Sequence, residues 1–256
     1  MVVGGANAEV LIQDDFEGGY SDGDLLGQVN PNGQAWYASG WVDQPLLRGD
    51  YGMGPSKGAG QDRSLNTAAG VYRIPFGRAV TAADPDNIIL FSYDARSGAE
   101  PQNGEVVASM NLCNEAKGDW MLLGSIDSAY NAVGRGNFAF NGAYEHTGSP
   151  IRVSNQGWFN FYGTIDLGLG EATLNFQSYD DPGLNGTFFN EWDNTGINEP
   201  AFDPDCLQVF TTCWADPFPY DGVGSGIDNL SFVTVPEPAT LCLLGLGGLA
   251  LLRRRK

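Results

Sequence analysis

Residues 158–177 read WFNFYGTIDLGLGEATLNFQ, and this stretch decides the fold class. Apolar and polar residues alternate on both sides of a glycine-rich centre, and a period of two is typical of half-buried strands. The centre, Gly168-Leu169-Gly170-Glu171, supplies a turn, so the stretch predicts a β-hairpin. The residues expected on its inward face are Phe159, Phe161, Ile165, Leu167, Ala172, Leu174 and Phe176.

The region 9–235 as a whole also reads as β. Further strands are expected at Val10–Phe16, Val71–Phe76, Ile88–Tyr93, Glu105–Leu112, Trp120–Ile126, Asn137–Phe140 and Ile227–Val235, with a further candidate at Leu207–Thr212. The pattern is weak over 18–61 and 180–226, which are rich in glycine, asparagine and aspartate. Many short strands joined by turn-rich links predict an all-β, antiparallel sandwich or jelly roll.

Composition excludes several classes of function. The 256 residues hold 36 glycines, 13 Lys and Arg, and 31 Asp and Glu, which gives a formal net charge of −18. Binding to nucleic acid needs clustered basic residues, so no nucleic-acid partner is expected. A single histidine excludes histidine-rich metal sites, and four cysteines are too few for a disulfide scaffold.

The C-terminus has three parts in order. Val235 is followed by Pro-Glu-Pro, then by the uncharged run ATLCLLGLGGLALL at 239–252, and Arg253–Lys256 end the chain. A helix over that run reaches only about 21 Å, so it could cross a membrane marginally, with the basic end in the cytoplasm. The alternative is a buried helix of a soluble domain, which the basic residues disfavour.

This order resembles the PEP-CTERM sorting signal of exported proteins in bacteria that secrete exopolysaccharide. The resemblance covers 235–256 and implies a membrane-held tail at 236–256, a sorting protease that cuts near Pro-Glu-Pro, and a final place in the cell envelope or extracellular matrix. At the other end, Ala6-Asn7-Ala8 has the form of a signal-peptidase site. Residues 1–8 are therefore expected to be a signal-peptide remnant or a disordered tail.

The opening Asp14-Asp15-Phe16-Glu17-Gly18 and the closing Gly226-Ile-Asp-Asn-Leu-Ser-Phe232 resemble the lectin-like and carbohydrate-binding jelly rolls. The length favours the larger, concanavalin-like sandwich. On a regular strand Asp228 would share the inward face of Leu230 and Phe232, where a carboxylate is costly unless it is paired or bound to a cation. The resemblance implies a structural Ca²⁺ between the first and last strands, held by Asp15, Glu17 and Asp228. The alternative is an Asp228 at the sheet rim that accepts backbone hydrogen bonds.

Catalytic motifs are incomplete. Glu191-Trp-Asp193 is similar to the paired carboxylates of jelly-roll glucanases, but their third acid is missing. Gly19–Gly23 matches G-x-S-x-G, but no helix pattern follows it. His146 is predicted to be a surface residue. The expected role is therefore that of a non-catalytic exported surface or extracellular-matrix protein, with extracellular polysaccharide as a candidate ligand. The alternative is a polysaccharide-active enzyme, a glycoside hydrolase or lyase, on a jelly-roll fold.

Aromatic and sulfur-containing residues give two further predictions. Exposed tryptophans could stack on sugar rings, and the candidates in loop-like sequence are Trp36 with Tyr37, Trp41, Trp192 and Trp214. Disulfides persist in exported proteins, so a bridge between Cys206 and Cys213 is expected if the segment between them turns back. Cys113 is then a free buried thiol, and Cys242 lies in the membrane helix.

Overall fold

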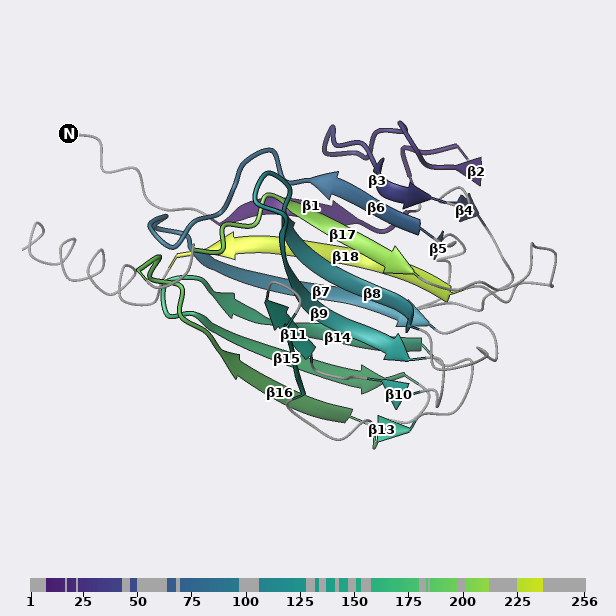
Figure 1. The fold of residues 1–256 in the computed structure, drawn as a ribbon. Helices are drawn as coiled ribbons and strands as arrows, with labels where there is room; N and C mark the ends of the chain where they lie inside the picture. Colours follow the sequence, from purple (N-terminus) through teal and green to yellow (C-terminus); the bar gives the residue numbers. More distant parts are fainter. Residues whose placement is uncertain are drawn as a thin grey trace, which may run out of the picture.

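The computed structural model describes residues 8–16, 18–21, 23–42, 47–49, 64–67, 70–96, 106–127, 132–133, 137–140, 143–146, 151–152, 158–179, 183, 185–197, 201–211 and 225–236. Within these residues the chain forms two antiparallel sheets that face each other (Figure 1). The expected all-β sandwich is confirmed.

The first sheet contains the last described strand of the chain, which pairs with other strands on both sides. Its order is β16 (Asn185–Glu191), β15 (Glu171–Ser178), β14 (Trp158–Asp166), β7 (Ile88–Arg96), β18 (Ser225–Val235), β5 (Ser64–Thr67), β4 (Leu47–Gly49) and β2 (Gly23–Asp24). The first strand, β1 (Glu9–Asp14), pairs with β18 beyond the end of β5. The predicted contact between the opening and closing strands is therefore present.

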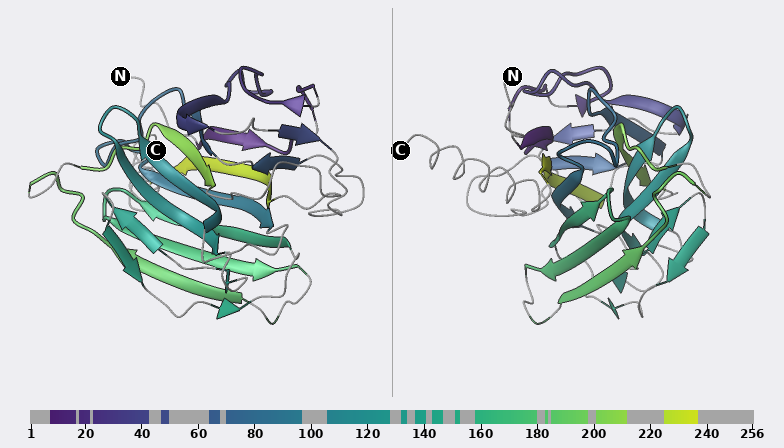
Figure 2. Two further views of the ribbon diagram at one scale, coloured as in Figure 1. Left: turned by 45° about the vertical axis from the view of Figure 1, so that its right-hand side comes forward. Right: turned by 90° about the vertical axis from the view of Figure 1, so that its left-hand side faces the viewer.

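The second sheet lies across the first (Figure 2). Its order is β12 (Ala143–His146), β11 (Asn137–Phe140), β9 (Asp119–Asp127), β8 (Val106–Asn114), β17 (Cys206–Thr211), β6 (Gly70–Pro75) and β3 (Tyr37–Val42). The short strands β10 (Ala132–Val133) and β13 (Ile151–Arg152) join it beside β9.

The predicted hairpin is the pair β14 and β15. Eight cross-strand positions pair, from Phe159 with Ser178 to Asp166 with Glu171. At the turn, the Gly170 N–H donates to the Asp166 carbonyl oxygen at 2.9 Å, and Gly170 has a φ of +69°. An added Cβ at Gly170 would lie 2.1 Å from the Trp192 carbonyl oxygen, so both the backbone angle and the close approach require glycine here.

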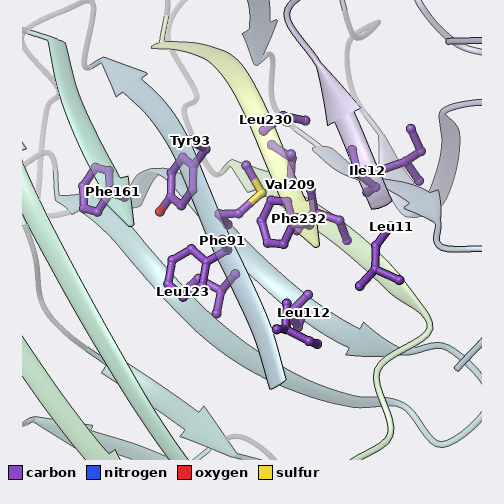
Figure 3. Close-up of a cluster of buried hydrophobic side chains, with 14 of the residues drawn as sticks. Leu11, Ile12, Phe91, Tyr93, Leu112, Leu123, Phe161, Val209, Leu230 and Phe232 are labelled. Atoms are coloured by element: carbon purple, nitrogen blue, oxygen red, sulfur yellow. The ribbon is translucent and has the colours of Figure 1, made fainter. Parts of the chain in front are cut away.

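The core lies between the two sheets (Figure 3). Aromatic side chains on the inward face of the first sheet stack in pairs. The ring centroids of Phe91 and Phe232 are 6.0 Å apart, and those of Tyr93 and Phe161 are 5.1 Å apart. Leu112, Leu123 and Val209 meet them from the second sheet. Because the inward residues of β14 and β15 are those predicted from alternation, the opposite residues of these strands face outward.

Two expectations about the cysteines and the tail can be compared with the fold. Cys206 begins β17, which pairs on both sides and carries the chain about 17 Å away by Thr211, so the 206–213 bridge does not fit. Cys113 is a buried thiol, as predicted. Cys213 and the expected helix over 239–252 lie outside the described residues. Among those described, no helix is long and apolar enough to cross a membrane.

Candidate functional site: the outer face of the first sheet

The outer face of the first sheet carries four rows of residues, because directly paired residues on neighbouring strands point to the same side. The rows run across β18, β7, β14, β15 and β16. They are Asp228, Asp94, Asn160, Gln177 and Asn185; Ser231, Ser92, Tyr162, Asn175 and Thr187; Val233, Leu90, Thr164, Thr173 and Phe189; and Val235, Ile88, Asp166, Glu171 and Glu191.

Two aromatic side chains stand out of the middle rows. Tyr162 is 41% exposed and Phe189 is 49% exposed. They are two strands apart and one row apart, so their Cα atoms are separated by about 12 Å. Neither residue was among the aromatic candidates predicted from the sequence.

Amide and hydroxyl groups fill the space between these rings. The Thr187 hydroxyl donates to Asn175 Oδ1 at 2.7 Å, and Asn175 Nδ2 donates to the Tyr162 main-chain oxygen at 3.4 Å. These two hydrogen bonds fix the orientation of the Asn175 amide beside Tyr162. The result is a broad polar face with two apolar rings and fixed hydrogen-bonding groups.

One edge of this face is an acidic row of three residues, Asp166, Glu171 and Glu191. Glu171 pairs directly with both of the others across the strands. Asp166 Oδ1 accepts the Leu169 N–H at 2.8 Å and so supports the hairpin turn. Like charges in direct cross-strand contact destabilise a sheet, so the row has a cost for folding that the turn contact of Asp166 offsets in part.

The opposite edge holds a buried polar group, which we call the Asp94 network. Asp94 is fully buried, and its Oδ1 accepts Tyr179 Oη at 2.6 Å and Asn160 Nδ2 at 2.9 Å. Its Oδ2 accepts Asn229 Nδ2 at 2.7 Å. Burial, the hydrogen bond to Asp94 and the charges of Asp94 and Asp228 raise the pKa of the Tyr179 hydroxyl.

Asp228 belongs to this network and not to the core face. Asn229 has a φ of +52°, and Asn229 and Leu230 together oppose Tyr93, which makes a β-bulge. Asp228 therefore pairs with Asp94 on the outer face, while Leu230 and Phe232 point into the core. The expectation that Asp228 shares their face is wrong. Its Oδ1 accepts the Asn229 N–H at 2.7 Å.

The predicted calcium ligands lie in different settings. Asp15 is exposed, Asp228 is buried, and Glu17 lies outside the described residues. The buried acid of the opening motif is Asp14, whose Oδ1 accepts the Phe16 N–H at 2.9 Å and whose Oδ2 accepts the Tyr20 hydroxyl. Within the described part of the chain, no three acidic, histidine or cysteine side chains group as a metal site. The described donors thus do not by themselves make a calcium site.

The structure describes the side chains of two of the predicted tryptophan candidates. Trp36 is completely buried in the core, and Trp192 is partly buried against it. The Tyr37 hydroxyl donates to Glu115 at 2.8 Å. The Trp41 side chain and Trp214 lie outside the described part. Trp36 is therefore not a sugar platform.

The catalytic candidates are spread over the molecule. Glu191 ends β16 opposite Glu171, whereas Asp193 accepts the N–H and hydroxyl of Thr195 in an exposed turn. Ser21 lies before the strand β2, in a loop where its N–H donates to Gln28. His146 ends β12, and its side chain lies outside the described ones.

Comparison with known proteins gives one family match. Residues 234–256 match the PEP-CTERM protein-sorting motif. The match begins inside β18 and confirms the resemblance seen in the sequence, and it indicates an exported protein that is sorted to the cell envelope. No curated protein has a significantly similar sequence.

Solved structures resemble the fold at low sequence identity. A carbohydrate esterase from the Shiga toxin-encoding bacteriophage phi24B is 12% identical, with a TM-score of 0.51 over 89% of this chain and 99% of that one. Basic winged bean lectin is 10% identical, with a TM-score of 0.49 over 84% and 98%. Arcelin-5, a lectin-like defense protein from Phaseolus vulgaris, is 8% identical, with a TM-score of 0.46 over 91% and 100%. The likeness concerns the fold alone.

Proposed function

We propose that this chain is a non-catalytic, exported protein that binds extracellular polysaccharide on the outer face of β14, β15 and β16. The observation that carries the proposal is the pair Tyr162 and Phe189, two exposed rings on the otherwise polar outer face of β14, β15 and β16. Binding sites for small ligands combine apolar surface with a few polar groups of fixed direction. A sugar ring presents one apolar face and a rim of hydroxyls, which suits this arrangement.

The charge of the face restricts the ligand. Asp166, Glu171 and Glu191 border the aromatic pair, and the whole chain carries a net charge of −18. A polysaccharide of uronic acids would be repelled by this field. The ligand we expect is a neutral glycan or one with amino sugars.

A glycan array with residues 8–236 tests the binding. We expect neutral or amino-sugar polysaccharides to bind and alginate to be bound weakly or not at all. Tyr162→Ala and Phe189→Ala should each lower the affinity roughly tenfold or more, about 1.4 kcal/mol. Val29→Ala, which also shortens an exposed apolar side chain but lies outside the face, is the matched control. Binding that survives both aromatic substitutions would contradict the proposal.

One observation favours the alternative of a polysaccharide-active enzyme. Glu171 and Glu191 face each other directly, and retaining glycosidases need two carboxyl groups about 5 Å apart. A panel of β-glucans, galactans, alginates and acetylated glycans, assayed for new reducing ends, unsaturated products and released acetate, tests this alternative. The non-catalytic proposal expects no turnover. Turnover that disappears in Glu191→Gln but persists in Asp193→Asn would establish the enzyme instead.

A further inference from the structure

Two cysteines far apart in the sequence lie directly opposite each other in the second sheet. Cys113 of β8 and Cys206 of β17 are cross-strand partners. They are 93 residues apart in the chain, and each is 1% exposed. Directly opposed residues of antiparallel strands have Cα atoms about 4.5–5.5 Å apart. Disulfides need a Cα separation of roughly 4.4–6.8 Å, so this pair meets the requirement without movement of the backbone.

The two thiols point to the same side of the sheet. Leu112 and Leu207, their neighbours in sequence, are core residues, so alternation directs both cysteines away from the core. Cys206 Sγ lies 3.6 Å from the Cys113 carbonyl oxygen. A hydrogen bond between the two thiols, together with burial, raises the pKa of Cys206. Both residues are free thiols in the structure, and their opposed positions on β8 and β17 place them within reach of each other.

We propose that Cys113 and Cys206 form an intramolecular disulfide in the exported protein. The chemistry is thiol–disulfide exchange with an oxidant that itself carries a disulfide. Each cysteine gives up one hydrogen, the S–S bond forms between the two sulfurs, and the oxidant leaves as a dithiol that holds both electrons and both protons. The inference rests on the export indicated by the sorting motif, and it is independent of glycan binding.

The compartment to which the chain is sorted and the accessibility of the thiols during folding both favour this reaction. Disulfides persist outside the cytoplasm, where the sorting motif directs the chain. Oxidation would take place while the chain folds, because both thiols are shielded once the sheet is complete. The bond would then tie β17 to β8 at the end of the strand pair, where Asp205 also donates its N–H to the Cys113 carbonyl at 2.9 Å. It would close a loop of more than ninety residues, for which the chain-entropy model predicts a large effect.

The test uses the full chain, exported from its native host or through a bacterial periplasm. The unfolded protein is treated with an alkylating reagent without reductant and digested with chymotrypsin, whose cleavage after Phe210 separates Cys206 from Cys213. We expect a linked peptide pair that contains Cys113 and Cys206 and is two hydrogens lighter than the separate thiols. Alkylation of both residues, or a bond from either one to Cys213 or Cys242, would overturn the proposal.

Stability gives a second measurement. Reductant should lower the melting temperature of the exported protein by roughly 5–15 °C, and Cys113→Ser should do the same and abolish the response. Cys213→Ser is the control and should leave both the linked peptide and the response unchanged. A melting temperature that does not respond to reductant would contradict a buried cross-strand bond, whatever the variants do.

Discussion

At the scale of single residues, Asn229 determines where the acids of the outer face point. Its positive φ belongs to a β-bulge, in which β18 has one residue more than its partner β7. Asp228 therefore points to the outer face beside Asp94, whereas Leu230 and Phe232 point into the core. Asparagine adopts this conformation more readily than most residues, but alternation in the sequence contains no signal for a bulge. The closing motif therefore indicates Asp228 as a candidate site residue. The direction of its side chain and its pairing with Asp94 could not be predicted.

The Asp94 network gives the first prediction. Asp94→Ala removes the fully buried acceptor of three side-chain donors, those of Tyr179, Asn160 and Asn229. Asn160 keeps its bond to the Ser92 hydroxyl at 3.0 Å. We expect a loss of about 2–4 kcal/mol of unfolding free energy, because unsatisfied buried donors carry the full cost of desolvation. Tyr179→Phe should lose only about 1 kcal/mol. Denaturant unfolding measures both.

The exposed Asp24 is the control for this network. It accepts one local N–H, from Leu26, at 3.0 Å, so Asp24→Ala should change the unfolding free energy by less than about 1 kcal/mol. If Asp94→Ala is no more harmful than Asp24→Ala, the network does not stabilise the sheet.

At the scale of elements, most of the long alternating strands were predictable and so was the four-residue β11, whereas β16 and the short strands β2, β4 and β5 were not. β14 and β15 were found to within a residue, because burial on one face imposes a period of two over eight or nine positions. β2, β4 and β5 have only two to four residues, too few for a period to show. Trp36 illustrates the same limit, since loop-like sequence around it hid a completely buried core residue.

The segment after β6 gives the second prediction, because Arg78 pairs with three acidic residues. Its guanidinium lies 2.6 Å from Glu9 of β1, 3.0 Å from Asp84 and 2.8 Å from Asp86. Asp86 also accepts the Thr234 hydroxyl of β18 at 2.6 Å. Arg78→Met keeps the apolar stem and removes the charge, and it should cost about 1–2 kcal/mol at low salt.

The comparison variant for Arg78 is Lys117→Met. Lys117 forms one ion pair, with Asp203 at 2.5 Å, and a single half-exposed pair contributes less than about 1 kcal/mol. Unfolding at low and high salt should show a larger and more salt-sensitive loss for Arg78. Equal losses in the two variants would mean that the acids around Arg78 act separately and not as a network.

At the scale of the whole molecule, the third prediction concerns the Ca²⁺ expected between the first and last strands. An ion held by Glu17 and Asp228 would stabilise the native state by about 2.7 kcal/mol at a hundredfold excess over its Kd. EDTA should then lower the melting temperature by roughly 5–10 °C, and Asp228→Asn should remove that difference. Mg²⁺ in place of Ca²⁺ is the control for general screening of the net charge of −18. Identical curves with and without chelator would rule out the ion.

The last prediction concerns the border between the folded domain and the sorting tail. Val235 still pairs with Ile88, and Pro236 is buried, so the sandwich extends up to the Pro-Glu-Pro segment. A chain that ends at Pro236 should therefore melt at the same temperature as the full chain. A chain that ends at Phe232 loses the pairs of Val233, Thr234 and Val235 and should be several kcal/mol less stable.

In cells, the same border separates the residues that form the folded domain from those that determine where the protein is located. The sorting motif covers 234–256, and its apolar and basic parts follow Pro238. Deleting 239–256 leaves every described strand in place, so the protein should fold, be exported and appear in the medium and no longer with the cells. Fractionation with an antibody against the domain measures this release, and the full-length chain is the control. Continued association of the truncated chain with cells would mean that the outer face, and not the tail, retains the protein there; in that case Tyr162→Ala in the truncated chain should release it.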